Sequence, residues 1–123
     1  MTDSKNMKIS IIGLGAIGSF VAEKVQKDKT LKLAAVFDSD ENKLRKFNKK
    51  IAFSSFDKFL KVKTDLVVEA ASAEAVKKYG PQILKKNNLL IMSVAAFADK
   101  NVVKKINSTA KNIKQNYSYH LGQ

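Results

Sequence analysis

The chain has 123 residues, a formal net charge of +12 and no cysteine. This length suits one domain, and an enzyme built of two domains would ordinarily need about twice as much. Without cysteine there is no disulfide framework, thiolate metal site or cysteine nucleophile. No apolar run approaches the ~20 residues of a membrane span, and no secretory signal is visible at the start, so we expect a cytoplasmic protein without membrane contact.

The positive charge does not indicate a nucleic-acid-binding protein. Arg45 is the only arginine among the 23 basic residues, and the lysines are spread along the whole chain. Base recognition favours arginine and interleaved aromatic side chains. We therefore interpret the lysines as solvated helix faces, which could still attract an anionic ligand.

Residues 8–18 carry the most informative pattern. An apolar, strand-like run of isoleucines stops at Gly13, and Gly13, Gly15 and Gly18 give the spacing G-x-G-x-x-G before residues with helical spacing. These glycines permit a tight turn, close approach of the backbone to a pyrophosphate, and close packing of helix on strand. The start of the helix offers N–H groups to the phosphates.

A second apolar run, residues 33–37, ends on Asp38, twenty residues after Gly18. A carboxylate at this place can accept hydrogen bonds from the adenosine ribose hydroxyls. Because the glycine motif lies between a strand and a helix and an acid closes the next strand, the sequence predicts a dinucleotide site. Asp38 favours NAD over NADP, whose 2′-phosphate it would repel; Lys43 and Arg45 are close enough in sequence to soften that preference.

The rest of the chain alternates between helix and strand. Residues 41–50 predict a polar helix with Asp40 as its N-cap, residues 51–53 a short strand, and Ser54 or Ser55 the start of a helical turn. Residues 65–69 predict a parallel strand covered on both faces, and residues 89–93 a fifth strand. Ser72 can cap the helix between them, which Gly80 and Pro81 should kink or split. A last helix is expected near residues 99–110. The fold class is therefore α/β, a Rossmann-type parallel sheet with helices on both faces.

In such sheets ligands bind beyond the carboxyl ends of the strands. Besides the glycine loop and Asp38, the segments at that edge are residues 70–72 and 93–96, whose small side chains leave room for a cofactor. The alternative is that small residues simply fill tight strand-to-helix turns.

Several of these segments resemble the nucleotide-binding half of L-aspartate dehydrogenase. They are residues 8–18, Asp65-Leu-Val-Val-Glu-Ala-Ala-Ser72, Glu74-Ala-Val with Tyr79-Gly-Pro81, and Ile91-Met-Ser-Val94. The resemblance covers about residues 7–114. It implies oxidation of L-aspartate with NAD or NADP to iminoaspartate, which feeds NAD biosynthesis or gives oxaloacetate and ammonia.

The resemblance also implies site residues. Gly13, Gly15, Ala16, Ile17, Gly18 and Asp38 would face the adenosine and pyrophosphate. Ala71 and Ser72 would lie towards the nicotinamide. The cofactor would be NAD, with NADP possible, and L-aspartate would bind only in the full-length enzymes. A homo-oligomer is also possible.

The end of the chain departs from the family. Where the family continues into a segment like Ile-Pro-Ser-Gly-Ala-Ile, this sequence reads Tyr117-Ser-Tyr-His-Leu-Gly-Gln123. One allowed coding, TAT TCA TAC CAT CTG GGG CAA TAG, gives Phe-Ile-Pro-Ser-Gly-Ala-Ile when read two bases later. We therefore expect residues 1–114 to form the NAD(P)-binding domain and residues 115–123 an aberrant tail, left by a frameshift that truncated an enzyme and inactivated it.

The chain offers no catalytic set and no metal-ligand cluster. His120 lies in the expected tail and matches no family motif, so we assign it no catalytic role. Glu69 could be an acid–base group near the cofactor edge, but a structural carboxylate is the favoured interpretation. Two alternatives stay open: a related NAD-binding domain of the homoserine dehydrogenase type, and a stand-alone NAD-binding, redox-sensing module.

Overall fold

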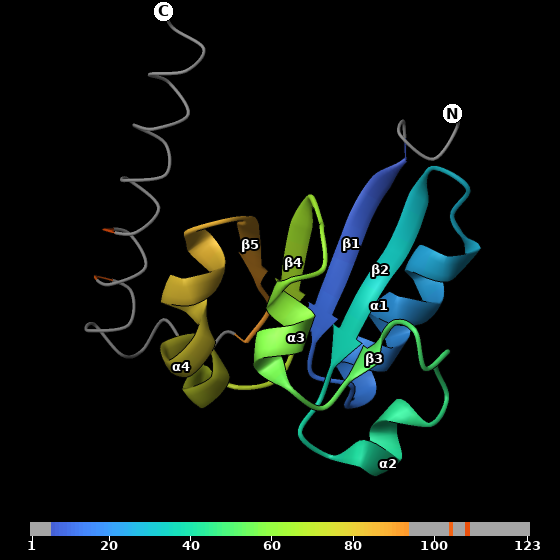
Figure 1. The fold of residues 1–123 in the computed structure, drawn as a ribbon, viewed down its shortest axis with the longest axis horizontal. Helices are drawn as coiled ribbons and strands as arrows, with labels where there is room; N and C mark the ends of the chain where they lie inside the picture. Colours follow the sequence, from blue (N-terminus) through green and yellow to red (C-terminus); the bar gives the residue numbers. More distant parts are fainter. Residues whose placement is uncertain (1–5, 94–103, 105–107, 109–123) are drawn as a thin grey trace, which may run out of the picture.

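The computed structural model describes residues 6–93, 104 and 108. A five-stranded, all-parallel sheet has the order β3-β2-β1-β4-β5 (Figure 1). Its strands are β1 (Met7–Ile12), β2 (Leu31–Phe37), β3 (Ala52–Phe53), β4 (Leu66–Glu69) and β5 (Asn88–Ile91). The helices are α1 (Ala16–Lys27), α2 (Glu41–Leu44), α3 (Phe56–Leu60) and α4 (Ala73–Leu84). The predicted last helix, residues 99–110, lies outside the described residues except for Lys104 and Ser108.

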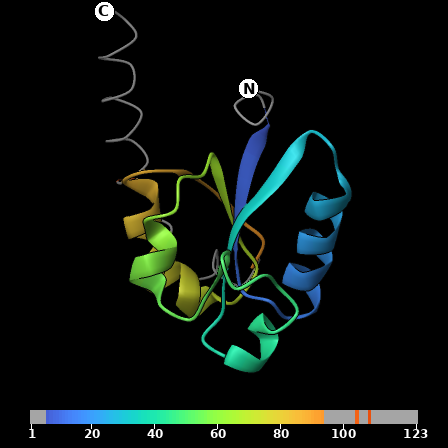
Figure 2. The same cartoon turned by 45° about the vertical axis from the view of Figure 1, so that its right-hand side comes forward.

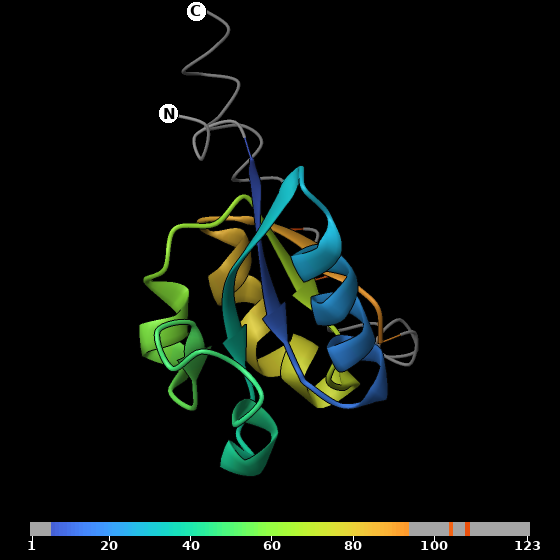
Figure 3. The same cartoon turned by 90° about the vertical axis from the view of Figure 1, so that its right-hand side faces the viewer.

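The strand order reverses between β1 and β4. From β1 the chain builds outward through β2 to β3, then returns to place β4 on the other side of β1 and β5 beyond it. Such a reversal opens a crevice at the carboxyl ends of the two central strands. The turns that follow β1 and β4 lie at that edge, towards which the arrowheads point in Figure 3.

Helices cover both faces of the sheet, as the sequence predicts. In Figure 2, α1 lies on one side of the strands and α3 and α4 on the other. One core cluster joins Ala22 and Val25 of α1 to the strands, and the other joins Phe59 of α3 and Ile83 of α4 to the opposite face. Tyr79 belongs to the second core, where its ring stacks on Phe56 at 4.1 Å between centroids.

One predicted helix is shorter in the structure. The helix expected over residues 41–50 is only α2, a single turn capped by Asp40, whose side chain accepts from the Asn42 N–H at 3.0 Å. After Leu44 the chain continues in turns: the Phe47 N–H donates to the Leu44 carbonyl at 3.0 Å, and Asn48 accepts the Lys50 N–H at 2.9 Å. Leu44 and Phe47 still reach the core, as expected.

Pro81 does not split α4, one of the two outcomes that the sequence predicted; the other, a kink, stays a prediction. The helix runs through it from Ala73 to Leu84. Val76 before the proline and Ile83 after it are both about 1% exposed, so core packing on both sides holds the helix together. Ser72 caps this helix and Ser55 caps α3, as the sequence predicts.

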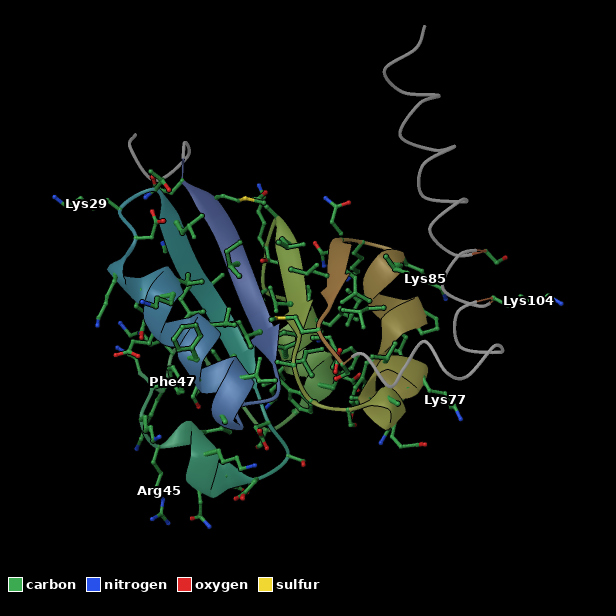
Figure 4. All side chains as sticks on the ribbon, turned by 180° about the vertical axis from the view of Figure 1, so that it is seen from behind. Lys29, Arg45, Phe47, Lys77, Lys85 and Lys104 are labelled. Atoms are coloured by element: carbon green, nitrogen blue, oxygen red, sulfur yellow. The ribbon has the colours of Figure 1, made fainter. Side chains whose placement is uncertain are left out.

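Within the part of the chain that the structure describes, no helix combines the length and apolar character that a membrane crossing requires. The lysines follow the scattered pattern expected from the sequence. Lys29, Lys77 and Lys85 point outward from separate parts of the molecule (Figure 4).

Candidate dinucleotide site

The glycine loop joins β1 to α1 at the strand-order reversal. Gly13 has φ +92°, in the left-handed region that favours glycine. A Cβ on Gly13 would lie 2.7 Å from the backbone and Cβ of Ala71, and a Cβ on Gly18 would lie 1.7 Å from the Gly13 carbonyl oxygen. The turn after β4, the glycine loop and the first turn of α1 therefore interlock, and neither glycine leaves space for a side chain.

Gly15 has a different role from its two neighbours. A Cβ there would meet no atom within 4 Å, and its φ of −71° is accessible to any residue. The fold itself does not require glycine at this position. The space above Gly15 is the kind of cradle in which a ligand backbone or phosphate can approach the chain.

The beginning of α1 is open to an anion. Its N-cap, Gly15, provides no capping side chain, and the first turn has no acidic residue. The first N–H groups of a helix lack partners within the helix and lie at its positive end. Ala16 and Ile17 are exposed here, whereas Gly18 is buried.

Asp38 is half-buried directly after β2 and binds the glycine loop. Its Oδ2 accepts the Leu14 N–H at 2.8 Å, and its Oδ1 accepts the Asp40 N–H at 2.8 Å. A carboxylate has about four acceptor positions, so two remain for ribose hydroxyls. The ribose contact of Asp38 was predictable from the sequence. Its hydrogen bond with the Leu14 N–H was not, because the two residues are 24 positions apart and leave no local pattern.

Ala71 and Ser72 are exposed in the turn between β4 and α4. Their N–H groups both donate to Glu69 Oε2 at 2.9 Å. The Ser72 hydroxyl accepts the Ala75 N–H at 3.1 Å and so caps α4. This turn lies beside Gly13, so the structure brings the two predicted halves of the site together.

Glu69 is the side chain for which the sequence allowed two roles, an acid–base group and a structural carboxylate. It is 1% exposed, and besides Ala71 and Ser72 it accepts the Ser93 N–H at 3.1 Å and the Ser93 hydroxyl at 2.5 Å. These contacts support the structural carboxylate over the acid–base group. Of the predicted segment 93–96, residues 94–96 lie outside the described residues.

An open groove of about 410 Å³ runs along α1 rather than across the strand-order reversal. It is lined by Ala16, Ser19, Phe20, Glu23, Gln26, Lys46 and Phe47. Of the predicted site residues, only Ala16 lines it. The interlocked loops are therefore a better guide to a dinucleotide than this groove, which lacks Asp38 and the glycines. Among residues 6–93, 104 and 108, no group of three or more His, Cys, Asp and Glu could hold a metal ion.

A family model described as the NAD-binding domain of homoserine dehydrogenase matches residues 13–120. L-Aspartate dehydrogenase of Methanocaldococcus jannaschii is 40% identical over 113 residues, which are 87% of this chain and 42% of that protein. L-Aspartate dehydrogenase of Archaeoglobus fulgidus is 35% identical, over 85% of this chain and 42% of that protein. The crystal structure of aspartate dehydrogenase from Thermotoga maritima is 32% identical with a TM-score of 0.66, covering 87% of this chain and 42% of that one.

These likenesses confirm the resemblance to L-aspartate dehydrogenases, the Rossmann-type fold and NAD(P) as the cofactor. The chain spans about two-fifths of the length of the curated relatives that it matches.

Proposed function

This chain belongs to the homoserine dehydrogenase NAD-binding domain family, and we propose that the carboxyl edge of its sheet holds the whole dinucleotide. The pyrophosphate lies on the glycine loop, Gly13 to Gly18, and on the N–H groups of Ala16 and Ile17. Asp38 binds the adenosine ribose, and Ala71 and Ser72 face the nicotinamide. The bound cofactor supplies the hydride-accepting ring; the residues bind and orient it.

The observation that carries this proposal is the open space above Gly15 within an otherwise interlocked loop. Gly13 and Gly18 are needed by the fold, but Gly15 is not. An absent side chain that the fold does not require is explained by a ligand that approaches the backbone. The uncapped start of α1 supplies the matching positive end.

We propose that the domain prefers NAD to NADP. The Asp38 carboxylate would repel a 2′-phosphate and accept a hydrogen bond from a free 2′-hydroxyl. Arg45 points outward after α2 in Figure 4, so its ability to offset this repulsion is limited. Isothermal titration calorimetry with both cofactors tests the preference, and equal or tighter binding of NADP would contradict the role of Asp38.

The whole-enzyme activity that fits these relatives is oxidation of L-aspartate. We propose that these 123 residues, in the cytoplasm, provide the cofactor-binding part and do not oxidise L-aspartate on their own. Hydride transfer needs the substrate held in a near-attack geometry, and holding it there can lower the activation barrier by ~7–11 kcal/mol.

The test is to join residues 1–114 to the remaining part of the Methanocaldococcus jannaschii relative and to follow NADH formation. We expect turnover with L-aspartate from the chimera and none from the 123-residue chain. L-Homoserine serves as the second substrate, because the matching family is described as the NAD-binding domain of homoserine dehydrogenase. The control is a second chimera, in which residues 1–114 are joined to the remaining part of a homoserine dehydrogenase. Comparing the two chimeras shows whether the added part alone decides between L-aspartate and L-homoserine. Turnover by the 123-residue chain alone would contradict the proposal.

A further inference from the structure

Glu69 is an acidic side chain enclosed at the end of β4. It is 1% exposed, yet it lies at the edge of the sheet where the turns before α1 and α4 meet. Its carboxylate accepts from three backbone N–H groups, those of Ala71, Ser72 and Ser93, and from the Ser93 hydroxyl. One carboxylate thus connects the ends of β4 and β5 to the start of α4.

Each of these four hydrogen bonds comes from a neutral donor. Donors that converge on both carboxylate oxygens suit the ionised form, because a protonated carboxyl would need an acceptor in the same space. A buried charge is costly unless an opposite charge or a set of hydrogen bonds offsets the loss of water. Glu69 has the set of hydrogen bonds. Because all of its donors are neutral, the carboxylate keeps its net negative charge.

The strand order places Glu69 opposite Asp38 across the glycine loop. Asp38 follows β2 on one side of β1, and Glu69 ends β4 on the other. A dinucleotide crosses the sheet at the reversal between β1 and β4. If its adenosine ribose is at Asp38, its other end extends over β4, on the Glu69 side.

We propose that Glu69 is a positioning residue whose negative charge selects the oxidised cofactor. The inference rests on the proposed function. The nicotinamide ring carries a positive charge in the oxidised dinucleotide and none in the reduced one. Glu69 holds the N–H groups of Ala71 and Ser72, so it sets the turn on which the ring rests, and its charge favours the positive ring over the neutral one.

The test compares the dissociation constants of NAD+ and NADH for the 123-residue chain and for Glu69→Gln by calorimetry. The ratio Kd(NADH)/Kd(NAD+) should exceed one for the unchanged chain and fall about fivefold in Glu69→Gln, the scale of two unit charges about 4 Å apart that are screened as in bulk water. Ionic strength is kept near 0.15 M, because at low salt the net charge of +12 favours the more anionic NADH.

Two matched variants separate charge from structure. Ser93→Ala removes the 2.5 Å hydrogen bond but keeps the Glu69 charge, so it can weaken both cofactors while the ratio stays. Asp65→Asn removes a charge just before the same strand, at the opposite edge of the sheet, where Asp65 accepts the Lys8 N–H at 2.8 Å. It should leave the ratio unchanged.

An unchanged ratio in a folded Glu69→Gln would overturn the inference, and so would an equal fall in Ser93→Ala. If circular dichroism shows that Glu69→Gln is unfolded, the test rests on the affinities of the unchanged chain. NADH that binds this chain as tightly as NAD+ overturns the inference. If the unchanged chain binds neither cofactor, the proposed function fails first, which distinguishes the two failures.

Discussion

The two edges of the sheet use the same chemistry for different purposes. At each edge, carboxylates accept backbone N–H groups, either within one turn or between segments. At the amino edge, Asp65 accepts from Lys8 and Asp28 accepts from Thr30, and both acids are exposed. At the carboxyl edge, Asp38 accepts from Leu14 while half-buried, and Glu69 is enclosed.

The difference lies in what surrounds those bonds. The carboxyl edge adds two glycines without room for a side chain, Gly13 packed against Ala71 and Gly18 packed against Gly13. These close backbone contacts and the partly buried hydrogen bond from the Leu14 N–H to Asp38 hold the loop together. We infer that the carboxyl edge is built to hold a bare backbone in one position for a ligand, while the amino edge only joins strands.

The largest effect is expected from adding one methyl group to the glycine loop. In Gly18→Ala the new Cβ would lie 1.7 Å from the Gly13 carbonyl oxygen, so α1 or the loop must move. We expect a loss of roughly 3 kcal/mol or more in the free energy of unfolding, the range of severe steric changes. Urea denaturation followed by circular dichroism measures it.

Gly15→Ala is the matched control, because its Cβ meets nothing within 4 Å. Its free energy of unfolding should stay within about 1 kcal/mol of the unchanged chain, the cost of alanine at an N-cap. Its NAD affinity should fall nonetheless. If both variants lose the same stability, or if Gly15→Ala binds NAD normally, the division between fold glycines and a ligand glycine is wrong.

The second effect concerns the acid that holds the loop. Asp38→Ala leaves the Leu14 N–H without its acceptor in a partly buried place. We expect a loss of about 1–3 kcal/mol in the free energy of unfolding, the cost of an unsatisfied buried donor. Thermal or urea unfolding without cofactor measures this contribution apart from ribose binding.

Asp65→Ala provides the comparison at the amino edge. The Lys8 N–H that loses its acceptor can bond to water, since the Asp65–Lys8 hydrogen bond is exposed. The loss should be smaller than about 1 kcal/mol. Equal losses in the two variants would show that the edges do not differ as proposed.

Features of the fold and of the site were predictable from the sequence where the interacting residues lie close together along the chain. Asp40, Ser55 and Ser72 were predictable as caps, because a cap and the N–H that it accepts lie two or three residues apart. The glycine spacing likewise predicted the turn and the dinucleotide site. The βαβ alternation likewise predicted the parallel sheet with helices on both faces, whereas the order of its strands came only from the structure.

Contacts between distant residues were not predictable in the same way. The bonds from Leu14 to Asp38 and from Ser93 to Glu69 each span 24 residues, so only the folded sheet brings the partners together. The same holds for the continuity of α4 through Pro81: the buried side chains of Val76 and Ile83, on either side of the proline, hold it as one helix. The helix expected over 41–50 ends already at Leu44, where local turns replace it.

A smaller effect is expected from the cap of α4. In Ser72→Ala the Ala75 N–H loses the hydroxyl that accepts it at 3.1 Å. The cost should be about 1 kcal/mol in the free energy of unfolding, typical of an N-cap serine. Ser54→Ala is the control, since Ser54 is exposed and its neighbour Ser55 supplies the cap of α3. A Ser72→Ala variant as stable as Ser54→Ala would contradict the cap.

The smallest effect lies at the amino edge and depends on pH. The Thr30 hydroxyl donates to Asp28 Oδ1 at 2.6 Å, and together with the Thr30 N–H it lowers the pKa of Asp28 below 3.8. Because the pKa is lower in the folded state, the contribution to stability is present above pH 3.8 and is lost as pH falls through the folded pKa. Thr30→Val removes the hydroxyl, so the pKa of Asp28 should rise towards 3.8, as an NMR titration of its carboxyl carbon would measure.

The free energy of unfolding should differ slightly between Thr30→Val and the unchanged chain at neutral pH, and the difference should vanish in acid. Asp28 is exposed, so water screens this interaction; a difference that persisted in acid would have to come from the side-chain exchange and not from the Asp28 charge.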